Sequence, residues 1–243
     1  MTTRLDAEPE TVRALARWLS AGEQQRADRY VLERDRRRFI VARARLRQLL
    51  AARLSTRPQL VELVYGEHGK PALAPQSGDT DWRFSVSHSD ELAVFAFARE
   101  QEVGIDIEAI REIPDADAIV FGFFSPRERQ AYLALGPEQK TLGFFNCWTR
   151  KEALLKALGR GLSAALDDFD VSLAPDEPAQ ILSLDDRPGS ASGWCLDSFS
   201  PSPGFVAAVA TRCPPAGAAG RIPAGGPVRD LGFALPALID DPR

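Results

Sequence analysis

The sequence contains little cysteine and no long apolar run. Only three of its 243 residues are cysteine, and Cys147, Cys195 and Cys213 are odd in number and widely spaced. This pattern predicts neither a disulfide framework nor a cysteine metal site. A reduced, cytoplasmic location is the simplest interpretation, because disulfides are rare in that compartment.

Two further absences exclude classes of protein. No stretch approaches the ~20 apolar residues that a membrane-spanning helix needs, so we expect no membrane partner. The first twenty residues lack an apolar core followed by a small-residue cleavage site, so we expect no signal peptide. The composition, 44% hydrophobic and 26% charged, is ordinary for a globular protein with a sizeable core.

The charged residues are unevenly distributed. Ten arginines lie between Arg26 and Arg53, whereas the chain has only four lysines. Three of these, Lys70, Lys151 and Lys156, fall inside the motifs discussed below. The placement is suggestive, because a chain that uses arginine elsewhere keeps lysine for few positions.

Local signals predict two helix-and-strand halves. In the first half we expect helices over about 20–32 and 36–53, a strand over 60–65, and a hairpin over 84–87 and 92–98. In the second half Ser125 should cap a helix that has Pro126 first and Glu128 three residues after the cap. A strong helix then runs through "TLGFFNCWTRKEALLKALG", and "FDVSL", "GWCLDSFS" and "GFVAAVAT" indicate strands of a second sheet.

The fold class that we expect is therefore α+β, because the strands cluster instead of alternating strictly with helices. We expect two similar halves related by a pseudo-twofold axis, each with a long helix on a small, mainly antiparallel sheet. The halves would be residues 1–103 and 104–213. Residues 214–243 are rich in proline, glycine and alanine and should be loosely ordered.

The hexapeptide "VGIDIE", residues 103–108, carries two carboxylates on one side of a predicted strand. Alternation turns Val103, Ile105 and Ile107 one way and Asp106 and Glu108 the other. One interpretation is a solvated acidic face. The other is a divalent-cation site, because Mg²⁺ typically takes one or two carboxylates together with waters and substrate phosphates.

The predicted helix "WTRKEALLKALGRGL" can supply a third carboxylate. Glu152 and Lys156 are four residues apart and share a face, which by itself could be a surface ion pair of ~0.3–0.5 kcal/mol. Trp148, one turn earlier on the same side, is unusual beside a wholly solvated pair. Three weaker motifs also occur: "RRRF" at 36–39, "GKP" around Lys70, and "FSVSHS" around Ser87 and His88.

The order of these motifs resembles the 4′-phosphopantetheinyl transferase superfamily, and the length and layout resemble its larger, surfactin-synthetase-type branch. The resemblance covers residues 36–166. Its most specific pieces are G-[IV]-D-[IV]-E at 104–108 and W-[ST]-x-K-E-A-x-x-K-x-x-G-x-G at 148–161. It implies transfer of the phosphopantetheine arm of coenzyme A to a serine of a carrier protein, with release of adenosine 3′,5′-bisphosphate.

The resemblance also implies roles for residues. Asp106, Glu108 and Glu152 would bind Mg²⁺, with Mn²⁺ as an alternative ion, and Glu152 and Lys156 would be catalytic. Glu128 is a second candidate base, although helix capping is the role that we favour for it. Coenzyme A as substrate would be bound by a set of side chains from both halves: Arg38, Lys70, Ser87, His88 and Lys156.

The partners implied are apo acyl or peptidyl carrier proteins or domains of secondary-metabolite biosynthesis, which would dock on residues 110–124. We expect a cytoplasmic monomer that binds neither nucleic acid nor membrane. Two alternatives use the same residues: a Mg²⁺-dependent nucleotide pyrophosphate hydrolase, and a non-catalytic coenzyme A-binding protein. The three carboxylates with a lysine argue against the second, because binding alone needs no third carboxylate.

Overall fold

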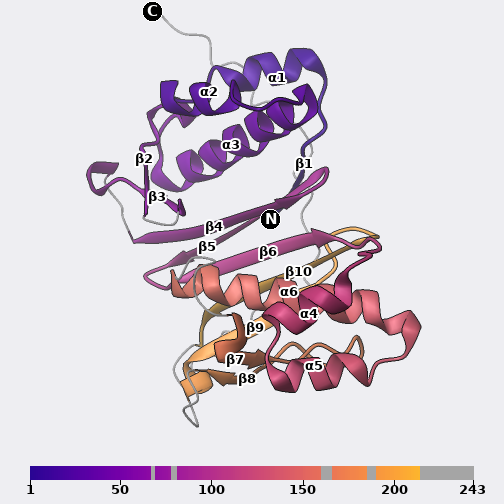
Figure 1. The fold of residues 1–243 in the computed structure, drawn as a ribbon. Coiled ribbons are helices and arrows are strands. Elements are labelled where there is room, and N and C mark those ends of the chain that lie inside the picture. The colour runs from indigo at the N-terminus through magenta and orange to yellow at the C-terminus, as the bar shows by residue number, and fades with distance from the viewer. Residues whose placement is uncertain (67–68, 78–80, 160–165, 185–189, 214–243) are drawn as a thin grey trace, which may run out of the picture.

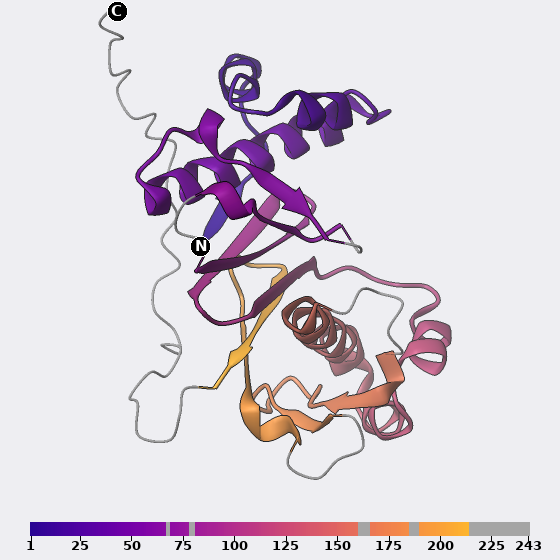
Figure 2. The same ribbon diagram turned by 90° about the vertical axis from the view of Figure 1, so that its left-hand side faces the viewer.

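The protein, seen here as a computed structural model, consists of two stacked halves (Figures 1 and 2). The structure describes residues 1–66, 69–77, 81–159, 166–184 and 190–213. Helices cover the outer side of each half, and the two main sheets lie between them (Figure 2). The expected tail, residues 214–243, lies outside the described residues.

The first half packs a long helix on a three-stranded antiparallel sheet with the order β1-β5-β4. A separate pair of strands, β2 and β3, flanks it. The elements are β1 (Thr2–Arg4), α1 (Pro9–Ala16), α2 (Ala21–Ala27), α3 (Glu33–Leu54), β2 (Leu63–Tyr65), β3 (Pro71–Leu73), β4 (Trp82–Ser89) and β5 (Leu92–Arg99).

The second half repeats this plan with the antiparallel sheet β6-β10-β9 and a smaller β7-β8 pair. Its long helix, α6, packs on β6 and β10. The elements are β6 (Val103–Ala109), α4 (Ala116–Phe123), α5 (Pro126–Leu133), α6 (Pro137–Leu158), β7 (Phe169–Val171), β8 (Ile181–Leu184), β9 (Trp194–Phe199) and β10 (Phe205–Arg212). The α+β class and the two similar halves are confirmed.

The helix signals identified in the sequence operate as expected. Ser20 and Ser125 each close a capping box with the glutamate three residues later, and Gly159 ends α6 in the left-handed conformation that glycine adopts without strain. The first predicted helix is too long, because α2 ends at Ala27. Val31 and Leu32 are exposed, so continuing the helix through them would bury nothing.

Two other expectations were wrong. The strand predicted from residue 60 begins at Leu63, because Pro58–Leu60 form a 3₁₀ turn in which proline needs no amide donor. The cysteines were expected to be unpaired, but Cys195 and Cys213 form a disulfide. These cysteines lie at one end of the antiparallel β9–β10 pair, which brings them together. Because the two cysteines are 18 residues apart, the sequence alone does not predict that they pair.

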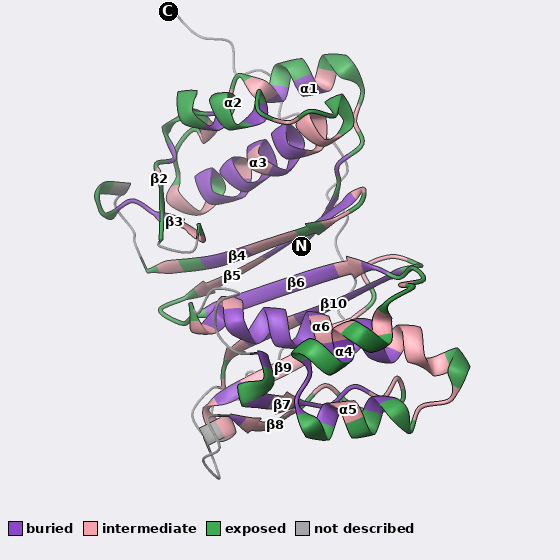
Figure 3. Cartoon of the chain, viewed as in Figure 1, coloured by how far each residue is buried: buried purple, intermediate pink, exposed green. Residues whose placement is uncertain are grey.

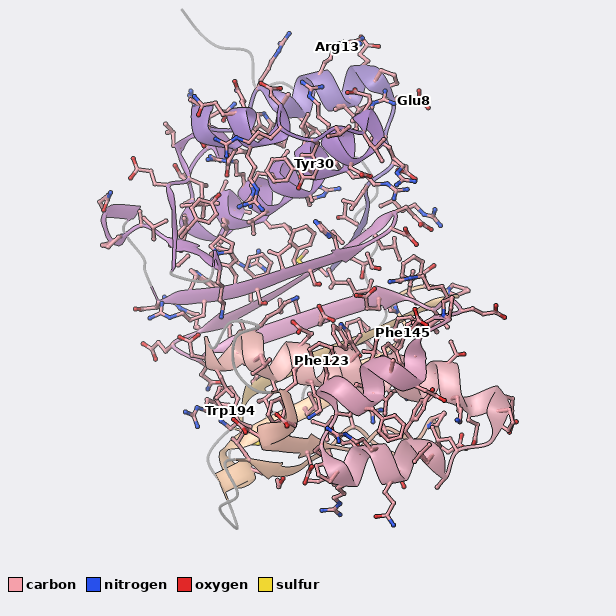
Figure 4. All side chains as sticks on the ribbon, viewed as in Figure 1. Glu8, Arg13, Tyr30, Phe123, Phe145 and Trp194 are labelled. Atoms are coloured by element: carbon pink, nitrogen blue, oxygen red, sulfur yellow. A yellow bond between two sulfur atoms is a disulfide. The ribbon has the colours of Figure 1, made fainter. Side chains whose placement is uncertain are left out.

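Three hydrophobic clusters account for the packing. One lies between the first sheet and helices α1 and α3, and a second surrounds α6 in the other half. Tyr30 packs on the first cluster and Phe145 belongs to the second, as Figure 4 shows. The third lies between the two sheets and joins Leu92 and Val94 of β5 to Ile105 and Ile107 of β6. The described part of the chain contains no helix long and apolar enough to cross a membrane.

Candidate active site

Strand β6 lies where the two halves meet, and its side chains alternate as the sequence predicts. Ile105 and Ile107 are buried in the cluster between the sheets. Gly104, Asp106 and Glu108 occupy the alternate positions, of which Gly104 lies against the backbone of α6. Figure 3 shows that most of β6 and the neighbouring face of α6 are buried. Asp106 is therefore a buried carboxylate, whereas a solvated acidic face would expose it.

Gly104 explains how closely α6 approaches this strand. A Cβ atom at residue 104 would lie 1.9 Å from the Ala153 carbonyl oxygen and 2.4 Å from the Ala157 amide nitrogen. Any other residue would therefore push the helix away from the strand. Because the two backbones touch here, Glu152 and Lys156 on α6 face the carboxylates of β6.

Asp106 is held by groups from both halves. Its Oδ1 atom accepts hydrogen bonds from Lys156 Nζ at 2.6 Å and from Ser87 Oγ at 2.7 Å. Lys156 Nζ also lies 3.1 Å from Ser87 Oγ. The other oxygen, Oδ2, is buried and has no hydrogen-bond partner among the residues that the structure describes. The aspartate thus keeps one oxygen that can bind a cation.

Glu152 is the second carboxylate with an unsatisfied oxygen. Only 9% of the residue is exposed, and its Oε1 atom has no hydrogen-bond partner. Burial and, to a smaller extent, the negative charges of Asp106 and Glu108 together raise the pKa of Glu152 to about 7, against the opposing effect of Lys156. Two buried carboxylates that repel each other form an unstable arrangement, which a bound cation would stabilise.

Glu108 is more exposed and better satisfied. Its Oε2 atom accepts a hydrogen bond from Ser89 Oγ at 2.8 Å and lies 3.3 Å from Arg111 Nη1. Among the residues that the structure describes, no three His, Cys, Asp or Glu side chains are grouped closely enough to hold a metal ion. The three carboxylates therefore do not form a closed ligand set by themselves, although Asp106 and Glu152 each keep an oxygen without a hydrogen-bond partner among the described residues.

Lys70 contacts the same region from the first half. Its Nζ atom donates to the Lys156 carbonyl oxygen at 2.6 Å and to the Val103 carbonyl oxygen at 3.3 Å. Burial lowers the pKa of Lys70, although Glu102 at 3.7 Å favours the charged form. Lys70 also lines a cavity of about 750 Å³ together with Arg83 and Gly159.

Arg38 of α3 and His88 of β4 lie together, in a different cavity from Lys70. They line a separate cavity of about 280 Å³. Arg38 forms a two-pronged ion pair with Asp6, at 2.8 and 3.0 Å, which raises the pKa of Arg38 and lowers that of Asp6. The structure thus brings Asp106, Glu152, Lys156 and Ser87 into one cluster and places the Arg38–His88 pair in a second one.

Glu128 has a structural role, as its capping position suggested. It accepts hydrogen bonds from the Ser125 and Val171 amides, and its Oε2 atom lies 2.8 Å from Lys151 Nζ. Both charged side chains are 1% exposed. Lys151 donates further to the carbonyl oxygens of Leu166 and Phe169. Because the Glu128–Lys151 pair is enclosed, Glu128 has no route to a substrate. The sequence alone does not show that this pair of charges is buried.

Two matched family models together cover almost all of the described chain. Residues 102–210 match the model of the 4′-phosphopantetheinyl transferase superfamily. Residues 6–100 match that of the 4′-phosphopantetheinyl transferase N-terminal region. The boundary between the matches lies just before β6.

Two relatives identified by sequence, HetI and Sfp, agree with this assignment. The 4′-phosphopantetheinyl transferase HetI of Nostoc is 37% identical over 206 residues, which are 85% of this chain and 84% of HetI. The transferase Sfp of Bacillus subtilis is 28% identical over 197 residues, 81% of this chain and 84% of Sfp. The solved structure of holo-[acyl-carrier-protein] synthase from Thermotoga maritima is 19% identical with a TM-score of 0.36, covering 46% of this chain and 62% of that one. The matches to family and relatives show that this chain belongs to the 4′-phosphopantetheinyl transferase superfamily.

Proposed function

We propose that the cluster of Asp106, Glu152 and Lys156 is the site at which this transferase moves the phosphopantetheine group of coenzyme A to a serine of a carrier protein. The transfer activity follows from the family. The observation that carries the site is the pair of buried, unpartnered carboxylate oxygens facing a lysine. Mg²⁺ dependence, the residue roles and the carrier class are parts of this proposal.

The donor set fits Mg²⁺. Asp106 Oδ2 and Glu152 Oε1 are hard oxygen ligands without a protein partner, and Mg²⁺ is typically bound by one or two carboxylates plus waters and phosphates. Glu108 would complete the site through its second oxygen. When bound, Mg²⁺ supplies positive charge to the pyrophosphate of coenzyme A and to the leaving bisphosphate. Mn²⁺ fits the same ligands.

Glu152 is the group that we assign to the serine proton. A pKa of about 7 suits a general base that works near neutral pH. Metal ligation would lower that pKa, so a water between Glu152 and the serine is the alternative route for the proton. Lys156 stabilises negative charge on the phosphate oxygens, since its ammonium already lies in the cluster and phosphoryl transfer depends mainly on positioning and charge neutralisation.

The nucleotide end of coenzyme A would extend along the first half. Arg38 and His88 line one cavity and Lys70 lines another. The phosphates of coenzyme A would therefore be bound by residues of more than one cavity. The proposed division between the halves lies at residue 104. Because one chain supplies the cluster residues of both halves, we propose a monomer as the active unit. A cytoplasmic location belongs to this proposal, although the Cys195–Cys213 disulfide is unusual in that compartment.

Residues 110–124 are the proposed docking segment for the carrier protein. Phe121 and Phe123 are half exposed, whereas Val120 and Phe124 are buried. Phe123, labelled in Figure 4, packs edge-on against Trp148, which lies one turn before Glu152 on α6. A carrier bound to Phe121 and Phe123 would therefore present its serine near the cluster.

One experiment separates transfer from the alternatives. The protein is incubated with coenzyme A, Mg²⁺ and an apo carrier protein, and the carrier mass and bisphosphate are measured. A carrier gain of one phosphopantetheine with equal bisphosphate supports the proposal. Bisphosphate without a carrier gain indicates a pyrophosphate hydrolase, and no turnover indicates a binding protein. Omission of Mg²⁺ tests the metal, and Asp106→Asn tests the ligand.

Docking is tested by Phe121→Ala with Phe123→Ala, and Leu60→Ala is the control because Leu60 is an exposed apolar residue of the first half. The double variant should raise the KM for the carrier roughly tenfold, since apolar anchors dominate such interfaces. The KM for coenzyme A should not change. An unchanged carrier KM, or an equal rise in Leu60→Ala, would place docking elsewhere.

A further inference from the structure

Strand β6 is bonded differently along its two edges. One edge pairs with β10 through the backbone, and β6 is an outer strand of its sheet. Along the other edge, side chains of β4 take the place of a strand. Ser85 Oγ accepts a hydrogen bond from the Ile105 amide at 3.2 Å, and Ser89 Oγ accepts one from the Ala109 amide at 3.0 Å.

The serines act as a set because of strand geometry. Residues 85, 87 and 89 alternate with Phe84, Val86 and His88, so the three hydroxyls share one face of β4. We call Ser85, Ser87 and Ser89 the serine ladder. Each successive serine contacts a position further along β6. Ser85 contacts Ile105, Ser87 contacts Asp106, and Ser89 contacts Glu108 and Ala109.

The ladder also reaches the two carboxylates of β6. Ser87 Oγ donates to Asp106, and Ser89 Oγ donates to Glu108 Oε2 at 2.8 Å. A hydroxyl has one proton to donate and lone pairs to accept with. Ser89 donates its proton to Glu108 and accepts from the Ala109 amide through a lone pair. The two hydrogen bonds together fix the orientation of the hydroxyl. The Ser85 hydroxyl, by contrast, accepts from the Ile105 amide of β6 and contacts no carboxylate among the described residues.

We propose that Ser89 is a positioning residue for the transfer reaction, because it orients the Glu108 carboxylate toward the cation site from the opposite half of the chain. The proposal rests on the proposed function of the cluster. Among the described residues, Ser89 and Arg111 both contact Glu108 at Oε2, which leaves Oε1 to bind an ion. Of the Ser89 and Arg111 contacts to Glu108, the one with Arg111 is the weaker, because the Arg111 side chain is 56% exposed and exposed ion pairs contribute little.

The test measures Mn²⁺ binding to the full-length protein by calorimetry, together with thermal melting. Ser89→Ala should raise the Mn²⁺ dissociation constant about tenfold or more, the usual effect of losing a group that orients a metal ligand. Ser89→Thr keeps the hydroxyl and should bind like the wild type. Ser85→Ala is the matched control: it loses a contact to β6 but none to a carboxylate, so it should change melting and leave Mn²⁺ affinity within twofold.

Arg111→Ala gives a second measurement on the same oxygen and should change the Mn²⁺ dissociation constant less than twofold. Equal Mn²⁺ affinity of Ser89→Ala and wild type, or an equal loss in Ser85→Ala, would overturn the positioning role. A tenfold loss in Arg111→Ala would assign that role to the arginine. If the wild type itself does not bind Mn²⁺, or Asp106→Asn binds it equally well, the cation site of the proposed function fails and the Ser89 role fails with it.

Discussion

Replacing Glu152 by glutamine should stabilise the metal-free protein while abolishing transfer. Glu152 is buried, its Oε1 atom has no partner, and the charge of Asp106 faces it. Glutamine has nearly the same shape without the charge. The substitution therefore removes the repulsion between two buried carboxylates and also removes a cation ligand and the proposed base.

The size of the stabilisation follows from the pKa. Burial, together with the charge of Asp106, raises the pKa of Glu152 from 4.5 to about 7, and a tenfold change in such an equilibrium corresponds to about 1.4 kcal/mol. The ionised carboxylate thus costs the folded, metal-free protein on the order of 3 kcal/mol above pH 7. Because the folded pKa is raised, the stability that the neutral form confers is fully present below about pH 4.5. It is lost as the pH rises through about 7.

Urea unfolding of wild type and Glu152→Gln at pH 5, 6, 7 and 8, with a chelator present, measures this difference. The variant should be more stable by about 3 kcal/mol at pH 8 and by roughly 1 kcal/mol at pH 5. Adding Mg²⁺ should then stabilise the wild type but not the variant, since only a bound native state gains stability. A variant that is less stable at pH 8, or a difference that does not vary with pH, would refute the reasoning.

Three other outcomes are expected. Lys156→Ala should lower kcat about 10²–10³-fold with a much smaller rise in the KM for coenzyme A, because a preorganised cation acts mainly on the transition state; near-normal kcat in steady-state kinetics would leave Lys156 as an ordinary ion-pair partner. Gly104→Ala should destabilise the fold by several kcal/mol in a thermal melt, since its Cβ would overlap the Ala153 carbonyl; an unchanged melt would show that α6 can shift freely. Reducing the Cys195–Cys213 disulfide should cost ~2–3 kcal/mol in urea unfolding, the amount that a closed loop of this length supplies; identical reduced and oxidised curves would contradict this.

Much of the fold could be predicted from local signals. The capping serines, the glycine after α6 and the period-two alternation of β4 to β6 each depend on a few neighbouring residues. Signals that depend on distant contacts were missed. The end of α2 is set by the absence of anything to bury Val31 and Leu32, and the Cys195–Cys213 pairing is set by the β9–β10 hairpin.

The candidate site divides in the same way. Alternation predicted that Asp106 and Glu108 share a side of β6, and helical spacing predicted that Glu152 and Lys156 share a face of α6. That these two faces meet was implied by the family resemblance and is explained by Gly104, which allows the backbones to touch. The division of the proposed substrate-binding residues into a Lys70 region and an Arg38–His88 region could not be predicted from their spacing in the sequence.

The family resemblance implied a site role for Ser87 of the serine ladder, whereas Ser85 and Ser89 were not predicted. The alternate serines of "FSVSHS" are also compatible with a polar strand face, because an edge strand commonly turns such a face to solvent. In the fold that face meets the unpaired edge of β6, so its hydroxyls replace a backbone ladder and two of them also bind carboxylates. The single strand β4 thus connects the halves and orients the site. A sequence pattern cannot distinguish this role of the serines from exposure to solvent until the strand opposite β4 is known.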